Sequence, residues 1–278
     1  MFRGLFAALL ALLFTACTAL PQPPIVAPTV GPQPTHPSGT SSPKPGRPTP
    51  TAPPSSPQPF WDLLFPGAEV RKTDDGLALL RHGAGLARYN IRIVRDPDET
   101  RSVSSWLQDD SKALAAVNCG FYWEKEGEFL HMGLLEVHEK RLANVRAKWG
   151  AALVIRNNRA LVVRKPKKRI PPMELGVQGW PLLLWNGKRV KELDEENLAR
   201  RTAVGVDAAG RVVWVVDGQG STLKAFAQRL RQKDIGLLYA VNLDGGASTG
   251  LRWRTSPEES QQGIDSFPIP CVITFTPR

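Results

Sequence analysis

Proline is concentrated in one stretch of this 278-residue chain, which limits where a globular fold can form. Of the 25 prolines, 15 lie in residues 21–59, a stretch that is also rich in Thr, Ser and Gly. With few apolar side chains, this stretch cannot bury enough surface to offset the entropy that is lost on ordering. All eight tryptophans and all 26 acidic residues lie beyond it. We therefore expect residues 17–59 to be a disordered linker and residues 60–278 to fold as one domain.

Residues 1–16 have the pattern of a signal peptide for export. Arg3 supplies the positive start, and residues 5–16 form an apolar run that is shorter than the roughly 20 residues of a membrane-spanning helix. Small residues then precede Cys17, as in bacterial lipoproteins, although Phe14 stands where leucine is usual. This pattern predicts an exported protein whose lipidated Cys17 anchors it to the bacterial cell envelope, with the domain outside the cytoplasm. The alternative is an ordinary secretory signal with an incidental cysteine.

Two further cysteines, Cys119 and Cys271, lie in the domain. Exported proteins fold in oxidising surroundings, so these two residues are candidates for a disulfide, and the loop that it would close is long enough to add appreciable stability. Two buried free thiols are the alternative, because the sequence does not report the distance between them.

Alternation of apolar and polar residues dominates the domain and predicts mainly β-strands. Paired apolar segments that flank turn residues, such as Asn157-Asn158, predict hairpins. The expected elements are a strand at residues 86–94, a hairpin at residues 151–163, a second hairpin at residues 203–216 and a closing strand at residues 272–275.

Two segments have helical spacing instead. Residues 102–110 predict a short helix capped by Ser102, and residues 222–233 predict a helix with one apolar face that is capped by Ser221. This mixture predicts an α+β fold: a mixed, β-sheet-rich single domain with a few packed helices.

Polar residues followed by glycine recur at the ends of the expected strands. In the densest group, Asn242 and Asp244 follow the apolar residues 237–241 and precede Gly245 and Gly246. Glycine lets the backbone turn sharply and leaves its amide groups accessible. Similar groups are Asn118-Cys119-Gly120, Arg201-Thr202 and Asp217-Gly218. Each alone is typical of an ordinary turn, but their recurrence predicts that these side chains converge on one site.

Four segments resemble, in this order, the successive motifs of the phosphodiester glycosidase domain family. They are Asn118-Cys119-Gly120-Phe121-Tyr122, Arg201-Thr202-Ala203-Val204-Gly205-Val206-Asp207, Val215-Val216-Asp217-Gly218 and Asn242-Leu243-Asp244-Gly245-Gly246-Ala247-Ser248. The resemblance covers residues 115–276, with Cys119 where glycine is usual and Ala247 in place of a common third glycine. Members of this family are hydrolases that remove the sugar from a sugar-1-phosphodiester and expose a phosphomonoester, so the resemblance implies an enzyme of that kind.

The resemblance also implies roles for individual residues. Asp244 would be the principal catalytic carboxylate, because an oxocarbenium-like transition state needs a carboxylate nearby. Asp217 would be the second carboxylate or an orienting group. Arg201 would clamp the phosphate, since a guanidinium binds phosphate in a bidentate manner. The expected substrate-binding residues are Asn118, Asn242, Gly245, Gly246, Ser248 and Thr202.

No cofactor is expected, since no Cys/His cluster has zinc spacing and no aspartate-rich loop fits calcium. Whether a divalent ion assists at the phosphate is left open. The net charge of +10, of which +7 belongs to the domain, suits a phosphate-bearing glycan or wall polymer as partner, and export argues against nucleic acid. The basic run at residues 165–169 fits either a solvated loop or a contact with anionic polymer. A monomer is expected.

Three aromatic or histidine residues have two interpretations each. His131 is either a proton-transfer group or an exposed loop residue, and Trp180 and Trp185 are either sugar-stacking faces or core residues. The predicted function is an exported, membrane-anchored hydrolase that cleaves a sugar from a glycosyl-1-phosphodiester in surface polysaccharide or cell-wall polymer. The alternative is a non-catalytic glycan-binding or envelope-assembly module with the same fold.

Overall fold

The computed structural model describes residues 60–167 and 170–278, so the predicted signal peptide, Cys17 and the linker lie outside the described residues. Strands make up 48% of the described residues and helices 8%. The protein is therefore predominantly β, and the expected α+β mixture is wrong in its share of helix. The reason is that helical spacing is confined to two short segments, and the second of them ends three residues before the expected position 233.

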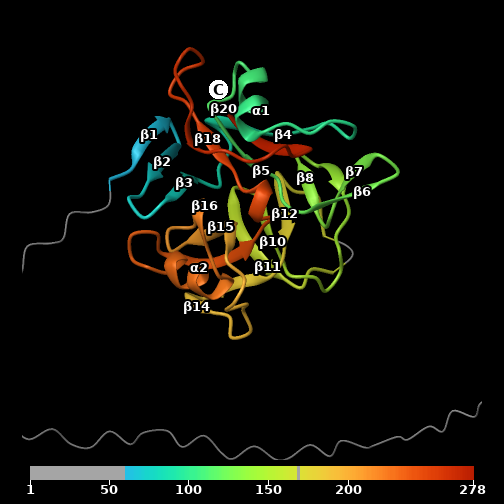
Figure 1. Ribbon diagram of the computed structural model, residues 1–278, viewed down its shortest axis with the longest axis vertical. Coiled ribbons are helices and arrows are strands. Elements are labelled where there is room, and N and C mark those ends of the chain that lie inside the picture. The colour runs from blue at the N-terminus through green and yellow to red at the C-terminus, as the bar shows by residue number, and fades with distance from the viewer. Residues whose placement is uncertain (1–59, 168–169) are drawn as a thin grey trace, which may run out of the picture. The chain divides into compact units, whose positions relative to one another are not determined.

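The largest sheet has eight strands in the order β1-β2-β3-β16-β15-β17-β13-β14, and all neighbouring strands are antiparallel (Figure 1). Its strands are β1 (Asp62–Phe65), β2 (Ala68–Lys72), β3 (Leu77–His82), β16 (Val212–Ser221), β15 (Ala199–Asp207), β17 (Leu237–Asn242), β13 (Leu182–Trp185) and β14 (Lys188–Arg189). β15 and β16 form the predicted second hairpin, which is longer than expected. This hairpin and β17 carry most of the motif residues.

Two five-stranded sheets and one separate hairpin complete the domain. One sheet contains β11 (Arg159–Arg164), β10 (Ala151–Arg156), β12 (Leu175–Gly179), β8 (Leu135–Val137) and β9 (Lys140–Ala143), in that order. The other contains β19 (Gln262–Ile264), β18 (Leu251–Trp253), β5 (Ala115–Asn118), β20 (Cys271–Pro277) and β4 (Tyr89–Arg95). The hairpin pairs β6 (Tyr122–Lys125) with β7 (Glu128–His131). The predicted hairpin around Asn157-Asn158 is confirmed as β10–β11, with positive φ at both asparagines.

The three large sheets share one hydrophobic core. Trp214 of β16, Leu153 of β10 and Ile273 of β20 belong to the same buried cluster, although they come from different sheets. Because antiparallel strands alternate their side chains between two faces, the opposite face of the eight-stranded sheet needs its own cover. Phe226 and Leu230 of helix α2 (Leu223–Leu230) supply that cover.

Both predicted helices occur, with one correction at a cap. Helix α1 (Val103–Asp109) begins after Ser102, whose side chain accepts from the Ser105 amide as predicted. Helix α2 is capped by Thr222 and not by Ser221, since Thr222 Oγ1 accepts from the Ala225 amide at 3.1 Å. Ser221 instead belongs to β16 and donates its hydroxyl hydrogen to Asp217.

His82, in β3, is a fully buried histidine with satisfied ring nitrogens. Trp214 Nε1 donates to His82 Nε2 at 3.0 Å, so the ring hydrogen is on Nδ1, which lies 2.8 Å from Gly83 O. Burial lowers the pKa of His82 from 6.5 to about 4. The imidazole is therefore a neutral structural group that connects β3 to β16.

We expect His82 to make the protein less stable in acid. The unfolded chain binds a proton as the pH falls below 6.5, whereas folded His82 stays neutral down to about pH 4. Its stabilising contribution is present above pH 6.5 and is lost as the pH falls to about 4, by about 3 kcal/mol in the free energy of unfolding. In urea titrations near pH 7 and pH 4, His82→Gln should lose about 3 kcal/mol less than wild type between the two conditions. An equal loss in both proteins would contradict this expectation.

Candidate active site

Three neighbouring strands of the eight-stranded sheet bring their motif residues to the same end of the sheet. These residues lie near the ends of β16 and β17 and at the start of β15. Arg201 of β15 is opposite Asp217 of β16, and Ala203 is opposite Asn242 of β17. Residues opposite one another in an antiparallel pair have their side chains on the same face. Asp217, Arg201 and Asn242 therefore share one face, which is the face that α2 covers farther along the strands.

Asp244 follows β17 at this same end of the sheet. The amide of Leu243 donates to Thr202 O at 2.8 Å, so the pairing of β17 with β15 continues beyond Asn242. Asp244 is the next residue along the chain and lies just beyond the end of β17. The structure thus brings Asp217, Arg201 and Asn242 together on one face of three adjacent strands, and Asp244 follows in the turn after β17.

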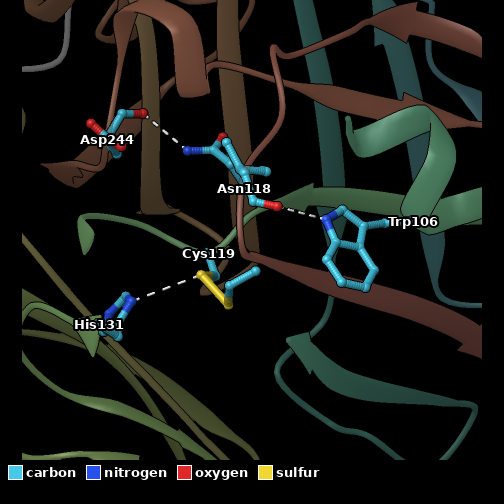
Figure 2. Close-up of a disulfide and its surroundings, with 7 residues drawn as sticks. Trp106, Asn118, Cys119, His131 and Asp244 are labelled. Atoms are coloured by element: carbon cyan, nitrogen blue, oxygen red, sulfur yellow. Dashed lines mark hydrogen bonds between the residues drawn. A yellow bond between two sulfur atoms is a disulfide. The ribbon is translucent and has the colours of Figure 1, made fainter. Parts of the chain in front are cut away.

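Asn118 and Thr202 contact the backbone of the Asp244 turn. Asn118 Nδ2 donates to Asp244 O at 3.0 Å, and Thr202 Oγ1 donates to Asn118 Oδ1 at 2.9 Å. The amide of Gly250 also points at Asn118 Oδ1, at 3.4 Å. Figure 2 shows the Asn118 amide reaching the Asp244 carbonyl while the Asp244 carboxylate points away. Asn118 and Thr202 are both buried, so in this structure they hold the turn in place across two sheets.

The carboxyl group of Asp244 is partly buried at the mouth of this turn. Desolvation by burial raises its pKa, and hydrogen bonds from the Ser248 side chain and the Gly245 amide oppose that rise. The Gly245 amide lies 3.0 Å from Asp244 Oδ1. A carboxyl group with a raised pKa can exchange protons with a substrate or attack it as a nucleophile.

Glycine is required at Gly245, where the turn approaches β15. A Cβ at that position would lie 2.7 Å from the carbonyl oxygen of Arg200, which is backbone and cannot move aside. Gly246 follows with φ +59 and begins a short 3-10 turn, η1 (Gly246–Ser248). Ser248 is buried within this turn. The glycines thus let the Asp244 turn pack against the start of β15.

Asp217 is buried, and three donors satisfy its carboxylate. Oδ1 accepts from the amides of Gln219 and Gly220 at 3.0 Å each, and Oδ2 accepts from Ser221 Oγ at 2.7 Å. These bonds shape the end of β16 before α2 begins. They also fix a negative charge opposite Arg201.

Arg201 is partly buried and is bound by carbonyl groups. Its Nε donates to Ser221 O at 2.9 Å, and its Nη2 donates to Asn197 O at 2.5 Å. Desolvation lowers the pKa of Arg201, and the charges of Asp194 and Asp217 oppose that effect. Within the described residues, no carboxylate lies within ion-pair distance of its guanidinium.

Arg200 is a second partly buried arginine that the sequence did not single out. Its side chain lies on the opposite face of β15, where Nη2 donates to Thr249 O at 2.7 Å and also to Asp265 O. Desolvation lowers the pKa of Arg200, and its Nε is buried without a partner in the described part of the chain. The only sequence signal was the adjacent Arg-Arg pair. Arg200 and Arg201 therefore extend from opposite faces of β15.

Asn242 connects the turn to the segment after β12. Its Nδ2 donates to Trp180 O at 2.8 Å, and its backbone amide donates to Pro181 O at 3.0 Å. Asn242 Oδ1 is buried and has no hydrogen-bond partner among the described residues. This leaves one acceptor free two residues before Asp244.

Cys119 and Cys271 form a disulfide that links the end of β5 to the start of β20 (Figure 2). His131 Nδ1 lies 3.8 Å from Cys119 Sγ. His131 is in β7 and not in the exposed loop that the sequence suggested, and its Nε2 is buried without a partner among the described residues. Burial lowers the pKa of His131 to about 4, with a smaller effect from the charge of Arg95.

No group of three or more His, Cys, Asp or Glu side chains in residues 60–167 and 170–278 is placed to hold a metal ion. No helix in those same ranges is long and apolar enough to cross a membrane.

The sequence matches one protein family, and the fold is similar to that of solved structures. The model of the phosphodiester glycosidase family matches residues 111–276. No curated protein matches the sequence. The crystal structure of a hypothetical protein from Synechocystis is similar with a TM-score of 0.57 and 15% identity, over 81% of this chain and 64% of that chain. This chain therefore spans less than two thirds of the length of the Synechocystis chain.

A second similar structure is the catalytic domain of zebrafish N-acetylglucosamine-1-phosphodiester α-N-acetylglucosaminidase. It has a TM-score of 0.55 and 20% identity, over 76% of this chain and 82% of that chain. At these identities the two structures show the fold alone. The family match covers more than half of the chain and includes all four motifs, so the resemblance predicted from them is confirmed. The chain belongs to the phosphodiester glycosidase family.

Proposed function

We propose that this protein is a hydrolase that cleaves the bond between C1 of a sugar and the phosphate oxygen of a glycosyl-1-phosphodiester. The observation that carries the proposal is the partly buried Asp244 carboxyl group, whose pKa is raised and which follows β17 at the end of the sheet where β15 and β16 carry Arg201 and Asp217. A site that offers a carboxylate and, separately, a cation suits a substrate whose reacting centre becomes positive while its leaving group is anionic.

The chemistry assigns a task to each group. As the C1–O bond breaks, the Asp244 carboxylate stabilises the positive charge at C1 or adds to it, and water finally supplies the oxygen of the free sugar. One proton of that water is transferred to the departing phosphate, which leaves as a monoester. A phosphate leaving group is already stable as an anion, so a guanidinium that binds it is more useful than a strong general acid. Arg201 has this task, and Asp217, whose oxygens already accept three hydrogen bonds, orients it.

The location and the natural substrate are parts of the same proposal. The apolar run before Cys17 and the proline-rich residues 21–59 support an exported hydrolase that a lipid and a long spacer hold at the cell envelope. The net charge of +10 supports an anionic polymer as its substrate. We infer a phosphate-bearing surface polysaccharide or cell-wall polymer.

The test is an assay of purified protein with synthetic methyl phosphodiesters of α-N-acetylglucosamine, glucose, galactose and mannose. The first of these is chosen because the zebrafish neighbour is named for that sugar. Equal release of free sugar and methyl phosphate, measured by chromatography and phosphorus NMR, would support the proposal. Saturable binding of polysaccharide without release of sugar from any diester would favour the non-catalytic glycan-binding module instead.

Arg201→Lys is expected to lower kcat/KM by about 100-fold, because lysine keeps the charge but loses the planar, paired donors that match a phosphate. The matched control is Arg211→Lys at the other end of the same hairpin, where Arg211 is paired with Asp207 beside the turn. Both variants should keep the wild-type circular dichroism spectrum. Equal activity of the two variants would remove the phosphate-clamp role from Arg201.

A further inference from the structure

We propose that Trp180 and Asn242 form the subsite that binds the sugar ring of the substrate. This inference rests on the proposed function and deepens it, because it places the sugar on the β12 side of Asp244 and the phosphate on the Arg201 side.

Trp180 is an exposed tryptophan. Its exposed fraction is 52%, similar to the 51% of Trp123 and above the 36% of Trp185, whereas Trp214 and Trp253 are buried. An indole is flat and largely apolar, and leaving it in water forgoes the free energy of its burial. Ligand sites commonly present such aromatic faces together with a few polar groups.

The backbone of Trp180 is held at the end of β17. Asn242 Nδ2 donates to Trp180 O at 2.8 Å, and the Asn242 amide donates to Pro181 O at 3.0 Å. The preceding residue also fits tightly, since a Cβ on Gly179 would lie 2.1 Å from Asn242 O. These contacts fix the backbone of Trp180 beside Asn242, two residues before Asp244.

This junction contains an unsatisfied acceptor. Asn242 is 5% exposed, and its Oδ1 has no partner among the described residues. Buried polar atoms are nearly always hydrogen-bonded, and an unsatisfied one costs free energy. A sugar hydroxyl or an acetamido N–H is a donor of the right kind for this atom.

Two further aromatic residues lie on segments next to the one that carries Trp180. A Cβ on Gly150 would lie 1.8 Å from Gly179 O, so the segment that carries Trp149 lies against the segment that carries Trp180. Trp149 packs edge-to-face on Phe121, with ring centroids 5.6 Å apart, and Phe121 follows the Asn118 motif. A pyranose has an apolar face of C–H groups and an edge of hydroxyl groups. An aromatic surface beside a free amide oxygen matches both.

The experiment compares Trp180→Ala with Trp123→Ala, a control of the same residue type and of nearly equal exposure, 51%, on the β6–β7 hairpin. With the diester that wild type cleaves best, Trp180→Ala should raise KM about tenfold and change kcat less than threefold, because stacking contributes to ground-state binding. Trp180→Phe should restore most of the loss, and Trp123→Ala should behave as wild type. A KM for Trp180→Ala within twofold of that for Trp123→Ala would overturn the subsite.

Binding of the 1-phosphates of the same four sugars, followed by tryptophan fluorescence, separates this inference from the proposed function. A change in fluorescence that is present in wild type and Trp123→Ala but absent in Trp180→Ala, without hydrolysis of any diester, would support the subsite and overturn the hydrolase proposal. Hydrolysis with a KM that does not depend on Trp180 would do the reverse. Neither binding nor hydrolysis would overturn both.

Discussion

Asp244→Asn is expected to remove almost all hydrolysis and, at the same time, to make the protein more stable at neutral pH. The amide has nearly the same shape as the carboxylate but cannot stabilise or attack a positive sugar carbon, so kcat/KM should fall by about 1,000-fold or more. The stability gain follows from the raised pKa of Asp244, whose main cause is desolvation.

The sign of the stability change is set by proton binding. Because the folded pKa of Asp244 lies above the ordinary value of 3.8, the folded state holds its proton more tightly than the unfolded chain. Stability from this group therefore falls as the pH rises from 3.8 through the folded pKa, and the full cost is present at pH 7. A neutral asparagine avoids that cost. Thermal unfolding of both proteins at pH 7 measures the difference, which should shrink in acid.

Asp207→Asn is the matched control for this prediction. Asp207 is a buried aspartate in the same strand as Arg201, but it is paired with Arg211 at 2.7 Å and lies at the far end of the hairpin. Its substitution should lower stability, because a buried cation-bound carboxylate is lost, and should leave turnover unchanged. If Asp244→Asn behaved like this control, Asp244 would be a structural residue and the assigned catalytic role would fail.

Removal of the disulfide is expected to have the largest effect on stability. Cys119 and Cys271 are separated by 152 residues in sequence, so their bond closes a very long loop in the unfolded chain. The loss in the free energy of unfolding should be about 3–5 kcal/mol. Cys119 also adjoins Asn118, which holds the Asp244 carbonyl, so activity should fall with stability.

Urea titration with and without reductant tests this expectation. Wild type should unfold at a lower urea concentration when a reductant is present, and the double variant Cys119→Ala/Cys271→Ala should unfold at that lower concentration under both conditions. A reductant effect on the double variant would have to come from another source. If the disulfide of wild type is completely reduced and the urea concentration at half-unfolding does not change, the prediction is contradicted.

Much of the fold could be predicted from the sequence, because the alternation of apolar and polar residues in a strand is a local property. It predicted the hairpin around Asn157-Asn158 and the β15–β16 hairpin, and a helix after Ser102. It placed the cap of α2 one residue too early, at Ser221, because Ser and Thr are both good caps and only the bond to Asp217 distinguishes them. Local patterns also could not show that helix would be so small a share of the domain.

The site was less predictable, because the face that a side chain occupies depends on pairing between distant strands. The sequence motifs include Asp244 and Arg201. They do not show that the side chain of the adjacent Arg200 lies on the other face of β15. They did not show that Asn118 contacts the backbone of Asp244. The burial of His131 beside the disulfide depends on β7 folding back, which has no local signal.

The way in which β3 and β4 join the sheets has a consequence for where this protein can be divided. The family segment, residues 111–276, begins after both strands, yet β3 pairs along β16 and β4 pairs along the whole of β20. A fragment cut at the family boundary would leave both partners as open, apolar sheet edges, which favour aggregation. The extent of the shared motifs and the extent of the folding unit are therefore different quantities in this protein, and a soluble catalytic fragment has to begin before β1.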